Sequence, residues 1–153
     1  MPDDLYDRDV LAWSEYQADL LRRMARGERA NELDWAHVIE EIEDVGLSEL
    51  HAVESYLEPV LVHLLKIRTW PDDDAANHWR AELVSFQSNA LRRYAASMRQ
   101  RIDIASAYRS AARQVTLLNK GGRPAGWPAE CPFTLDQLLT DRSESLETVL
   151  APD

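Results

Sequence analysis

The segment from Leu33 to Trp70 constrains the fold more than any other part of this 153-residue chain. Its apolar residues recur at steps of three and four, at Trp35, Ile39, Ile42, Leu50, Val53, Leu57, Val60, Leu61, Leu64 and Ile67. That spacing places them on one side of an α-helix, whereas a strand would need a step of two. We therefore expect one very long amphipathic helix whose apolar face points inward along the whole segment.

Two residues bear on the continuity of that helix. Gly46 lies on the apolar face, where its missing side chain lets another backbone approach closely. Pro59 has no amide hydrogen to bond the carbonyl of Ser55, which should bend the helix. Because the apolar spacing keeps its phase through both residues, we predict one kinked helix that ends at Trp70 and Pro71.

Three shorter helices are predicted beside the long one. They run from Asp7 to just before Gly27, from Asp72 to about Ser97, and from Ile104 to Gly121 and Gly122. Asp7 and Asp34 are suitable caps for the first helix and the long helix, because their carboxylates accept hydrogen bonds from unpaired amides. The residues expected to face inward are Val10, Trp13, Gln17, Leu20, Leu21 and Met24, then Trp79, Leu83, Phe86, Ala90 and Tyr94, then Ile104 or Ala105, Tyr108, Ala112, Val115 and Leu118.

The last thirty residues have a different composition. Several prolines and Gly126 oppose regular structure, while Trp127 and Phe133 are suitable anchors for an irregular segment. Thr134 and Gln137 form a capping-box pair that opens a short helix over 135–139. The predicted fold is all-α: an up-and-down four-helix bundle with one long kinked helix and a short C-terminal helix, in a single domain over residues 1–153.

Charge is distributed unevenly along this acidic chain, whose formal net charge is −10. Residues 1–58 hold 16 acids and 5 bases, residues 59–126 hold 5 acids and 11 bases, and residues 127–153 hold 6 acids and 1 base. Acidic early helices packed beside basic later ones would explain this pattern. The alternative is a nucleic-acid surface on the third and fourth helices made of Arg80, Arg92, Arg93, Arg99, Arg101, Arg109 and Arg113. An acidic protein is repelled by phosphate at long range, so nucleic acid is the less favoured partner.

The expected compartment is the bacterial cytoplasm. Cys131 is the single cysteine, so an internal disulfide is excluded and a reducing compartment is favoured. The residues Met1 to Asp4 lack the basic and apolar regions of a secretory signal, and no uncharged run is long enough to span a bilayer.

Metal or cofactor chemistry has little support in the sequence. A di-iron helical bundle needs Glu-x-x-His steps, and this chain has only the reverse, at His37-x-x-Glu40 and His51-x-x-Glu54. At about 100° per residue, His37, Glu40, Asp44, His51 and Glu58 cluster opposite the apolar face and are expected to point to solvent. We predict no metal, no cofactor and no catalytic residue.

Glu49 and His63 are the exceptions on the long helix. Glu49 lies near the centre of the apolar face, where a carboxylate is either paired with an arginine from a neighbouring helix or has a raised pKa in a pocket. His63 lies at the edge of the same face, where it bonds a carbonyl or acts as a base. With Glu43 they are the pocket candidates of an alternative hypothesis, a metal-dependent or hydrolytic enzyme with a crevice between helices.

Several motifs together resemble a known family. They are Trp13-x-x-x-Gln17-x-x-Leu20-Leu21, Glu32-Leu33-Asp34-Trp35, Ile39-Glu40-Glu41-Ile42-Glu43-Asp44-Val45-Gly46, His63-Leu64-Leu65-Lys66, Trp79, Ala107-Tyr108-x-x-Ala111 and Cys131-Pro132-Phe133-Thr134-Leu135. The chain resembles the bacterial domain of unknown function number twenty-nine over nearly its whole length, to about Leu139. The resemblance implies a small all-helical fold and no assigned activity.

The sequence favours a non-enzymatic interaction or regulatory module over an enzyme, and does not identify a specific activity. The acidic stripe of the long helix is the predicted contact with a protein partner, with Glu40 and Asp44 as its candidate residues. Trp70, with Leu61 and Leu65, is a candidate surface for a homodimer.

Overall fold

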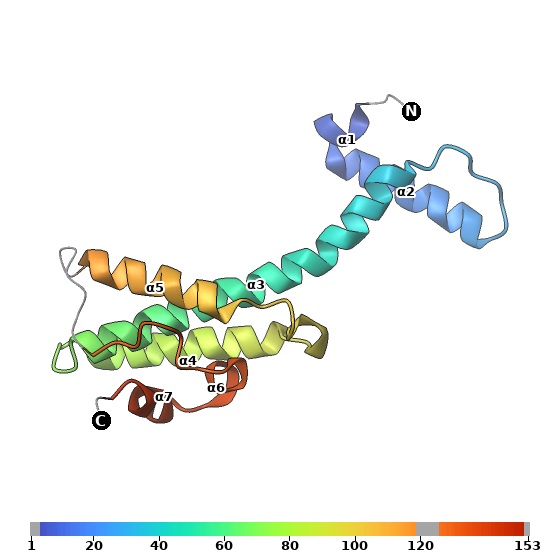
Figure 1. Ribbon diagram of the computed structural model, residues 1–153. Helices are drawn as coiled ribbons and strands as arrows, with labels where there is room; N and C mark the ends of the chain where they lie inside the picture. The colour runs from blue at the N-terminus through green and yellow to red at the C-terminus, as the bar shows by residue number, and fades with distance from the viewer. Residues whose placement is uncertain (1–3, 119–125, 152–153) are drawn as a thin grey trace. The chain divides into compact units, whose positions relative to one another are not determined.

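The computed structural model describes residues 4–118 and 126–151. Regular structure in these residues is helical: α1 (Leu5–Arg8), α2 (Val10–Ala25), α3 (Trp35–Thr69), α4 (Ala76–Arg93), a 3₁₀ turn (Ala96–Met98), α5 (Ile104–Leu118), α6 (Leu135–Thr140) and α7 (Ser143–Val149) (Figure 1). The predicted all-α class is confirmed, while the up-and-down four-helix arrangement stays a prediction. Within the described residues, no helix combines the length and apolarity that crossing a membrane requires.

The chain divides into two compact units, Met1–Leu47 and Ser48–Asp153, which we call the N-terminal and C-terminal units. The division falls inside α3, and each unit has its own cluster of buried apolar side chains. The predicted single domain therefore stays a prediction, and each unit is described by itself below.

In the N-terminal unit, the N-cap of α2 lies two residues later than predicted. The Asp9 carboxylate accepts a hydrogen bond from the Ala12 amide at 3.0 Å, so Asp9, and not Asp7, caps this helix. Gly27 follows its C-terminus with φ +86°, a left-handed conformation that glycine adopts without strain.

The core of this unit joins α2 to the start of α3. Its buried apolar residues are Trp13, Leu20, Leu33 and Val38. Val10 and Leu21 were also expected inside, yet Val10 is 54% exposed and Leu21 is 39% exposed. They lie outside because α2 buries only the side that carries Trp13, Gln17 and Leu20.

The prediction that α3 buries its apolar face throughout is wrong for the N-terminal unit. Trp35, Ile39, Ile42 and Val45 are each between 52% and 69% exposed. The side of α3 that packs against α1 and α2 carries Val38, together with His37, which bonds Asp34, and Glu41, which bonds Tyr6. A single covering layer buries only one side of a helix, so the neighbouring apolar residues stay in solvent.

The C-terminal unit has the larger core, and here the predicted face of α3 is buried. The side chains of this core are Val53, Leu57, Val60, Leu61, Leu64 and Leu65 from α3, Leu83 and Ala90 from α4, Tyr108, Ala111 and Val115 from α5, and Leu135, Leu138, Leu139, Leu146 and Leu150 near the C-terminus. The predicted anchors Trp127 and Phe133 also belong to it. The expected burial of Leu118 is wrong, and the predicted helix stop at Gly121 and Gly122 lies outside the described residues.

The C-terminal segment covers α4 with two short helices (Figure 1). The predicted capping box of Thr134 and Gln137 opens α6, whereas α7 was not foreseen from the sequence. The Arg68 guanidinium donates to the Leu150 carbonyl at 2.8 Å and closes the segment onto α3. Gly126 is required beside it, because its φ is +95° and a Cβ there would lie 2.7 Å from Arg68 Nη2.

Substitution of Leu61 by Ala should destabilise the protein by about 2–5 kcal/mol, because the fully buried side chain leaves a cavity in the core. Leu117→Ala is the matched control, since Leu117 is 67% exposed and its loss should change stability by no more than about 0.5 kcal/mol. Urea unfolding of the two variants measures both effects. Equal unfolding midpoints would contradict this core assignment.

Candidate functional site

The most prominent surface feature is a row of apolar side chains on the first turns of α3. Trp35, Ile39, Ile42 and Val45 follow one another at steps of four, three and three, so they lie along one side of the helix. Each is more than half exposed. We call these four residues the α3 stripe. A contiguous exposed apolar patch of this kind is typical of interaction sites.

Acidic residues border the α3 stripe along one edge. Around the helix axis, Glu43 is about 40° from Ile39, followed by Glu40 at about 100° and Asp44 at about 140°. All three are exposed. The first Lys or Arg of α3 is Lys66, so no Lys or Arg of this helix lies near them, although His37 interacts electrostatically with Glu40. Glu40 and Asp44 therefore lie where a partner can reach them, and Glu43 belongs to the same surface and not to a crevice.

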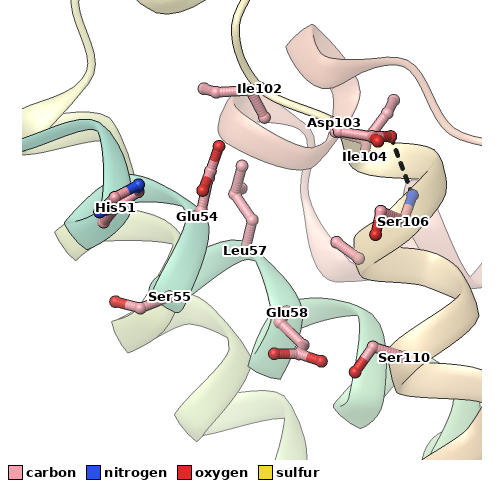
Figure 2. Close-up of a pocket in the computed structure, with 11 residues that line it drawn as sticks. His51, Glu54, Ser55, Leu57, Glu58, Ile102, Asp103, Ile104, Ser106 and Ser110 are labelled. Carbon is pink, nitrogen blue, oxygen red and sulfur yellow. Dashed lines mark hydrogen bonds between the residues drawn. The ribbon is translucent and has the colours of Figure 1, made fainter. Parts of the chain in front are cut away.

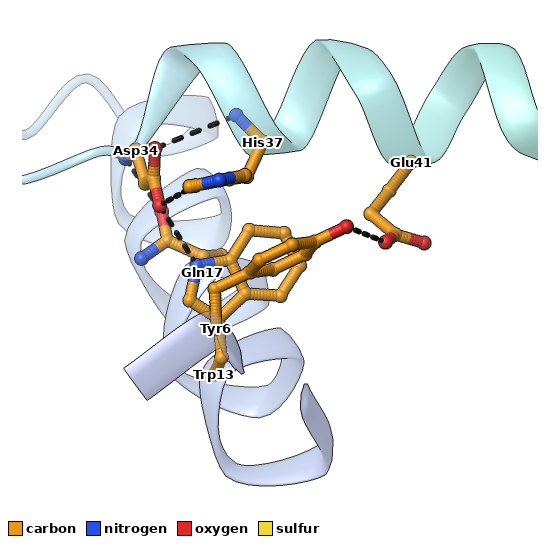
Figure 3. Close-up of polar contacts among 6 residues, drawn as sticks. All are labelled: Tyr6, Trp13, Gln17, Asp34, His37 and Glu41. Atoms are coloured by element: carbon orange, nitrogen blue, oxygen red, sulfur yellow. Dashed lines mark hydrogen bonds and ion pairs between the residues drawn. The ribbon is translucent and has the colours of Figure 1, made fainter. Parts of the chain in front are cut away.

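A polar cluster on another side of α3 fixes which side faces solvent (Figure 3). His37 Nδ1 is 2.7 Å from Asp34 Oδ2, and the Tyr6 ring stacks on the His37 ring at 3.9 Å between centroids. The Tyr6 hydroxyl donates to Glu41 at 2.6 Å, which ties α1 to α3. The prediction that His37 points to solvent is wrong in part, because these contacts hold the ring against Tyr6 and Asp34 and leave 35% of the side chain exposed.

Asp34 connects the same cluster to α2 (Figure 3). Its carboxylate accepts a hydrogen bond from Trp13 Nε1 at 3.1 Å, and its amide donates to Gln17 Oε1 at 2.8 Å. The carboxylate also accepts from the amide of His37 at 3.4 Å, so Asp34 caps α3 as the sequence suggested.

The contacts of this cluster shift the acidity of its members. The hydrogen bond with His37, and a second from Trp13, lower the pKa of Asp34. The same bond with Asp34 raises the pKa of His37. The hydrogen bond to Glu41, assisted by desolvation, raises the pKa of Tyr6 to about 12. The cluster therefore favours an ionised Asp34, a protonated His37 and a neutral Tyr6 hydroxyl that donates to Glu41.

A cavity of about 450 Å³ lies in the C-terminal unit between α3 and the start of α5 (Figure 2). Glu54, Glu58 and Asp103 line it, together with Leu57 and other residues of the two helices. Glu58 accepts a hydrogen bond from Gln114, and Asp103 caps α5 by accepting from the Ser106 amide, so two of these carboxylates have structural partners. His51 also lines the cavity, and its exposed side chain points to solvent as expected.

The described residues contain no group of three His, Cys, Asp or Glu side chains that could hold a metal ion. His51 and Glu54 both line the cavity, but the described residues there do not come together as three ligands for a metal ion.

Glu49 and His63, the other pocket candidates, each have a partner of their own. Glu49 lies 3.3 Å from Arg93 in an ion pair whose two side chains are about half exposed, so it is no buried pocket carboxylate. Buried His63 is 2.7 Å from the Pro59 carbonyl and 2.6 Å from Glu82, which lowers the pKa of Glu82. Glu82 also pairs with His78, four residues earlier on α4, a spacing that the sequence shows. The contact of Glu82 with His63 joins two helices and has no such signal.

Trp70 and its predicted companions do not form an apolar surface. Leu61 and Leu65 are fully buried, because α4 and the C-terminal segment cover them. Trp70 is half-buried and packs against Trp79, with 6.4 Å between ring centroids. Leu61 and Leu65 therefore cannot contribute to a dimer surface, while a homodimer contact at Trp70 stays a prediction.

The arginines of α4 and the loop that follows it are partly engaged within the fold. Arg80 forms a two-pronged pair with Glu147, and Arg99 pairs with Asp136. The exposed guanidiniums of Arg92, Arg101, Arg109 and Arg113 have no ion pair among the described residues. Nucleic-acid binding by this region stays a hypothesis.

Comparison with known proteins gives the family. The model of the family described as Domain of unknown function DUF29 matches residues 5–143, so the chain belongs to this family, as its motifs indicated. A crystal structure of an α-helical protein of unknown function from Rhodospirillum rubrum is 30% identical, with a TM-score of 0.73, covering 96% of this chain and 98% of that one. No curated protein matches the chain. The family and the similar structure have no assigned function.

Substitution of His37 by Gln should cost more stability in mild acid than in base. Because the folded-state pKa of His37 is raised, its contribution is present below the unfolded value of 6.5 and is lost as the pH rises through the folded value. Asp34 has a lowered pKa, so its contribution is present above 3.8 and is lost as the pH falls through the folded value. The pair therefore contributes fully between these two unfolded values.

Urea unfolding of wild type and His37→Gln at about pH 5.5 and about pH 9 measures this dependence. His51→Gln is the control, since His51 is exposed and has no ion pair among the described residues. The same stability loss for His37→Gln at both pH values would mean that the pair with Asp34 is not ionic.

Proposed function

We propose that this protein is a non-enzymatic interaction module that docks a helix of a protein partner on the α3 stripe. One observation carries the proposal: four large apolar side chains lie in solvent on successive turns of one helix, next to a core that excludes them. The steps of four and three from Trp35 to Ile39 and Ile42 match the anchor spacing by which helices pack together.

The energy available at this surface is sufficient for a specific contact. Burial of the exposed part of each stripe side chain contributes a favourable free energy of roughly 1–1.5 kcal/mol. For the whole stripe this amounts to about 4–6 kcal/mol, before the free-energy cost of association is subtracted. Trp35 is the largest anchor, and tryptophan is enriched among residues that dominate interface energies. A partner that adds its own contacts can therefore bind with useful affinity.

The polar cluster behind the stripe supports the same function. Tyr6, Trp13 and His37 hold α3 by stacking and hydrogen bonds, so Ile39 and Ile42 are presented on a fixed helix face. A preorganised surface loses less conformational entropy when a partner binds.

The proposal includes the setting predicted from the sequence. We place the protein in the bacterial cytoplasm, which the single, half-buried Cys131 supports. The single domain with an up-and-down four-helix arrangement is retained as the structural frame of the module. The enzyme alternative has less support, because Glu43 lies on the exposed side of α3 while Glu49 pairs with Arg93 and His63 with Glu82.

A photo-crosslinking residue in place of Ile42 should give one defined protein adduct when the full chain is expressed in its host. The same residue in place of Leu117 is the control, because both side chains are 67% exposed. Substituting Trp35 and Ile39 by Ser in the Ile42 derivative should abolish the adduct, since the partner would lose its other anchors. The double reversal Glu40→Lys and Asp44→Lys should abolish it as well. Equal adducts from positions 42 and 117, or an adduct insensitive to Trp35 and Ile39, would contradict the proposal.

A further inference from the structure

On the basis of the proposed docking function, we infer that the partner of the α3 stripe is a basic amphipathic helix. Its apolar side packs on the stripe, and Lys or Arg residues along one edge of that side meet Glu43, Glu40 and Asp44. The partner is thus defined by charge as well as by apolar spacing.

Charge complementarity is the first support for this partner. Glu40, Glu43 and Asp44 are exposed and have no ion pair among the described residues, whereas Glu41 on the inner side is bonded by Tyr6. An acidic partner would bring like charges together at the edge of the stripe. Their repulsion is strongly unfavourable because binding removes water from between them. A basic edge turns the same carboxylates into attractive groups and speeds association.

Gly46 is the second support, because no contact among the described residues requires a glycine at this position. It lies in the direction of the stripe, one turn after Ile42, and is exposed. A Cβ at this position would meet nothing within 4 Å, and its backbone does not have a positive φ. A helical glycine that intramolecular packing does not need lowers helix stability, so its use is to let another backbone approach closely.

A second copy of the chain is a poor partner for the stripe, because like charges would repel. Two stripes packed together would bring the acidic border of one copy near that of the other, with no Lys or Arg from the first half of α3 to offset the repulsion. An anionic membrane surface would repel the border likewise. These alternatives are distinguishable by experiment.

The test uses the full chain and two synthetic helical peptides with the same leucine face. One peptide carries Lys and Arg beside that face, and the other carries Glu at the same positions. Fluorescence anisotropy should show at least about tenfold tighter binding of the basic peptide at low salt, with the difference shrinking as salt rises.

Four variants connect that binding to the surface. Ile42→Ser should weaken binding of the basic peptide, and Glu40→Lys with Asp44→Lys should reverse the preference between the peptides. Gly46→Leu should weaken binding while raising the thermal unfolding temperature, which a merely structural role for this glycine would not produce. The control variants Leu117→Ser and Asp72→Lys with Asp74→Lys change exposed residues of the C-terminal unit and should leave binding unchanged.

The outcomes separate this inference from the proposed function. If both peptides bind equally and Ile42→Ser weakens both, the docking surface stands and the basic partner is overturned. If Ile42→Ser weakens neither, both are overturned. Sedimentation showing a dimer that Ile42→Ser dissociates would assign the stripe to a second copy. Flotation of the chain with vesicles rich in anionic lipid, lost in Ile42→Ser, would assign it to a membrane surface.

Discussion

The hydrogen bonds of Asp34 determine how the N-terminal unit presents α3. This one residue donates its amide to Gln17, accepts from Trp13 and His37, and caps the helix. Because these partners lie on α2 and on one side of α3, they set which side of α3 is inside. The apolar residues Ile39 and Ile42 then remain in solvent, and the candidate interaction surface follows from that orientation.

The C-terminal unit uses its charges in another way. Arg80 and Arg99 bond carboxylates of the C-terminal segment, Glu147 and Asp136, and thus help to hold α6 and α7 near α4. The basic residues in the middle of the sequence and the acidic residues near its end are therefore partly paired with one another inside this unit. The acidic border of the α3 stripe has no such partner among the described residues, which is why it is the better candidate for a contact with another molecule.

Much of the fold could be predicted because it depends on local patterns. The spacing of Leu57 and Leu64 gave the helix and its buried side in the C-terminal unit, and the pair of Thr134 and Gln137 gave the start of α6. The candidate site was predicted only in part. Glu40 and Asp44 were placed correctly in solvent, but Ile42 was assigned to the core because periodicity shows that an apolar side exists and not what covers it. Contacts between distant positions, such as Tyr6 with Glu41 or His63 with Glu82, leave no periodic signal.

By itself, the sequence determined the all-α class, most helix boundaries and the acidic character of the first half of α3. These properties depend on intrinsic backbone preferences, caps and residue charge, which act within a few residues. Only the tertiary structure decided that Val38 is buried while Ile39, its neighbour, is exposed. Both residues suit a core. The position of α2 determines which of them is buried, and that position is fixed by the contacts of Trp13 and Gln17 with Asp34 and His37, which lie far along the chain.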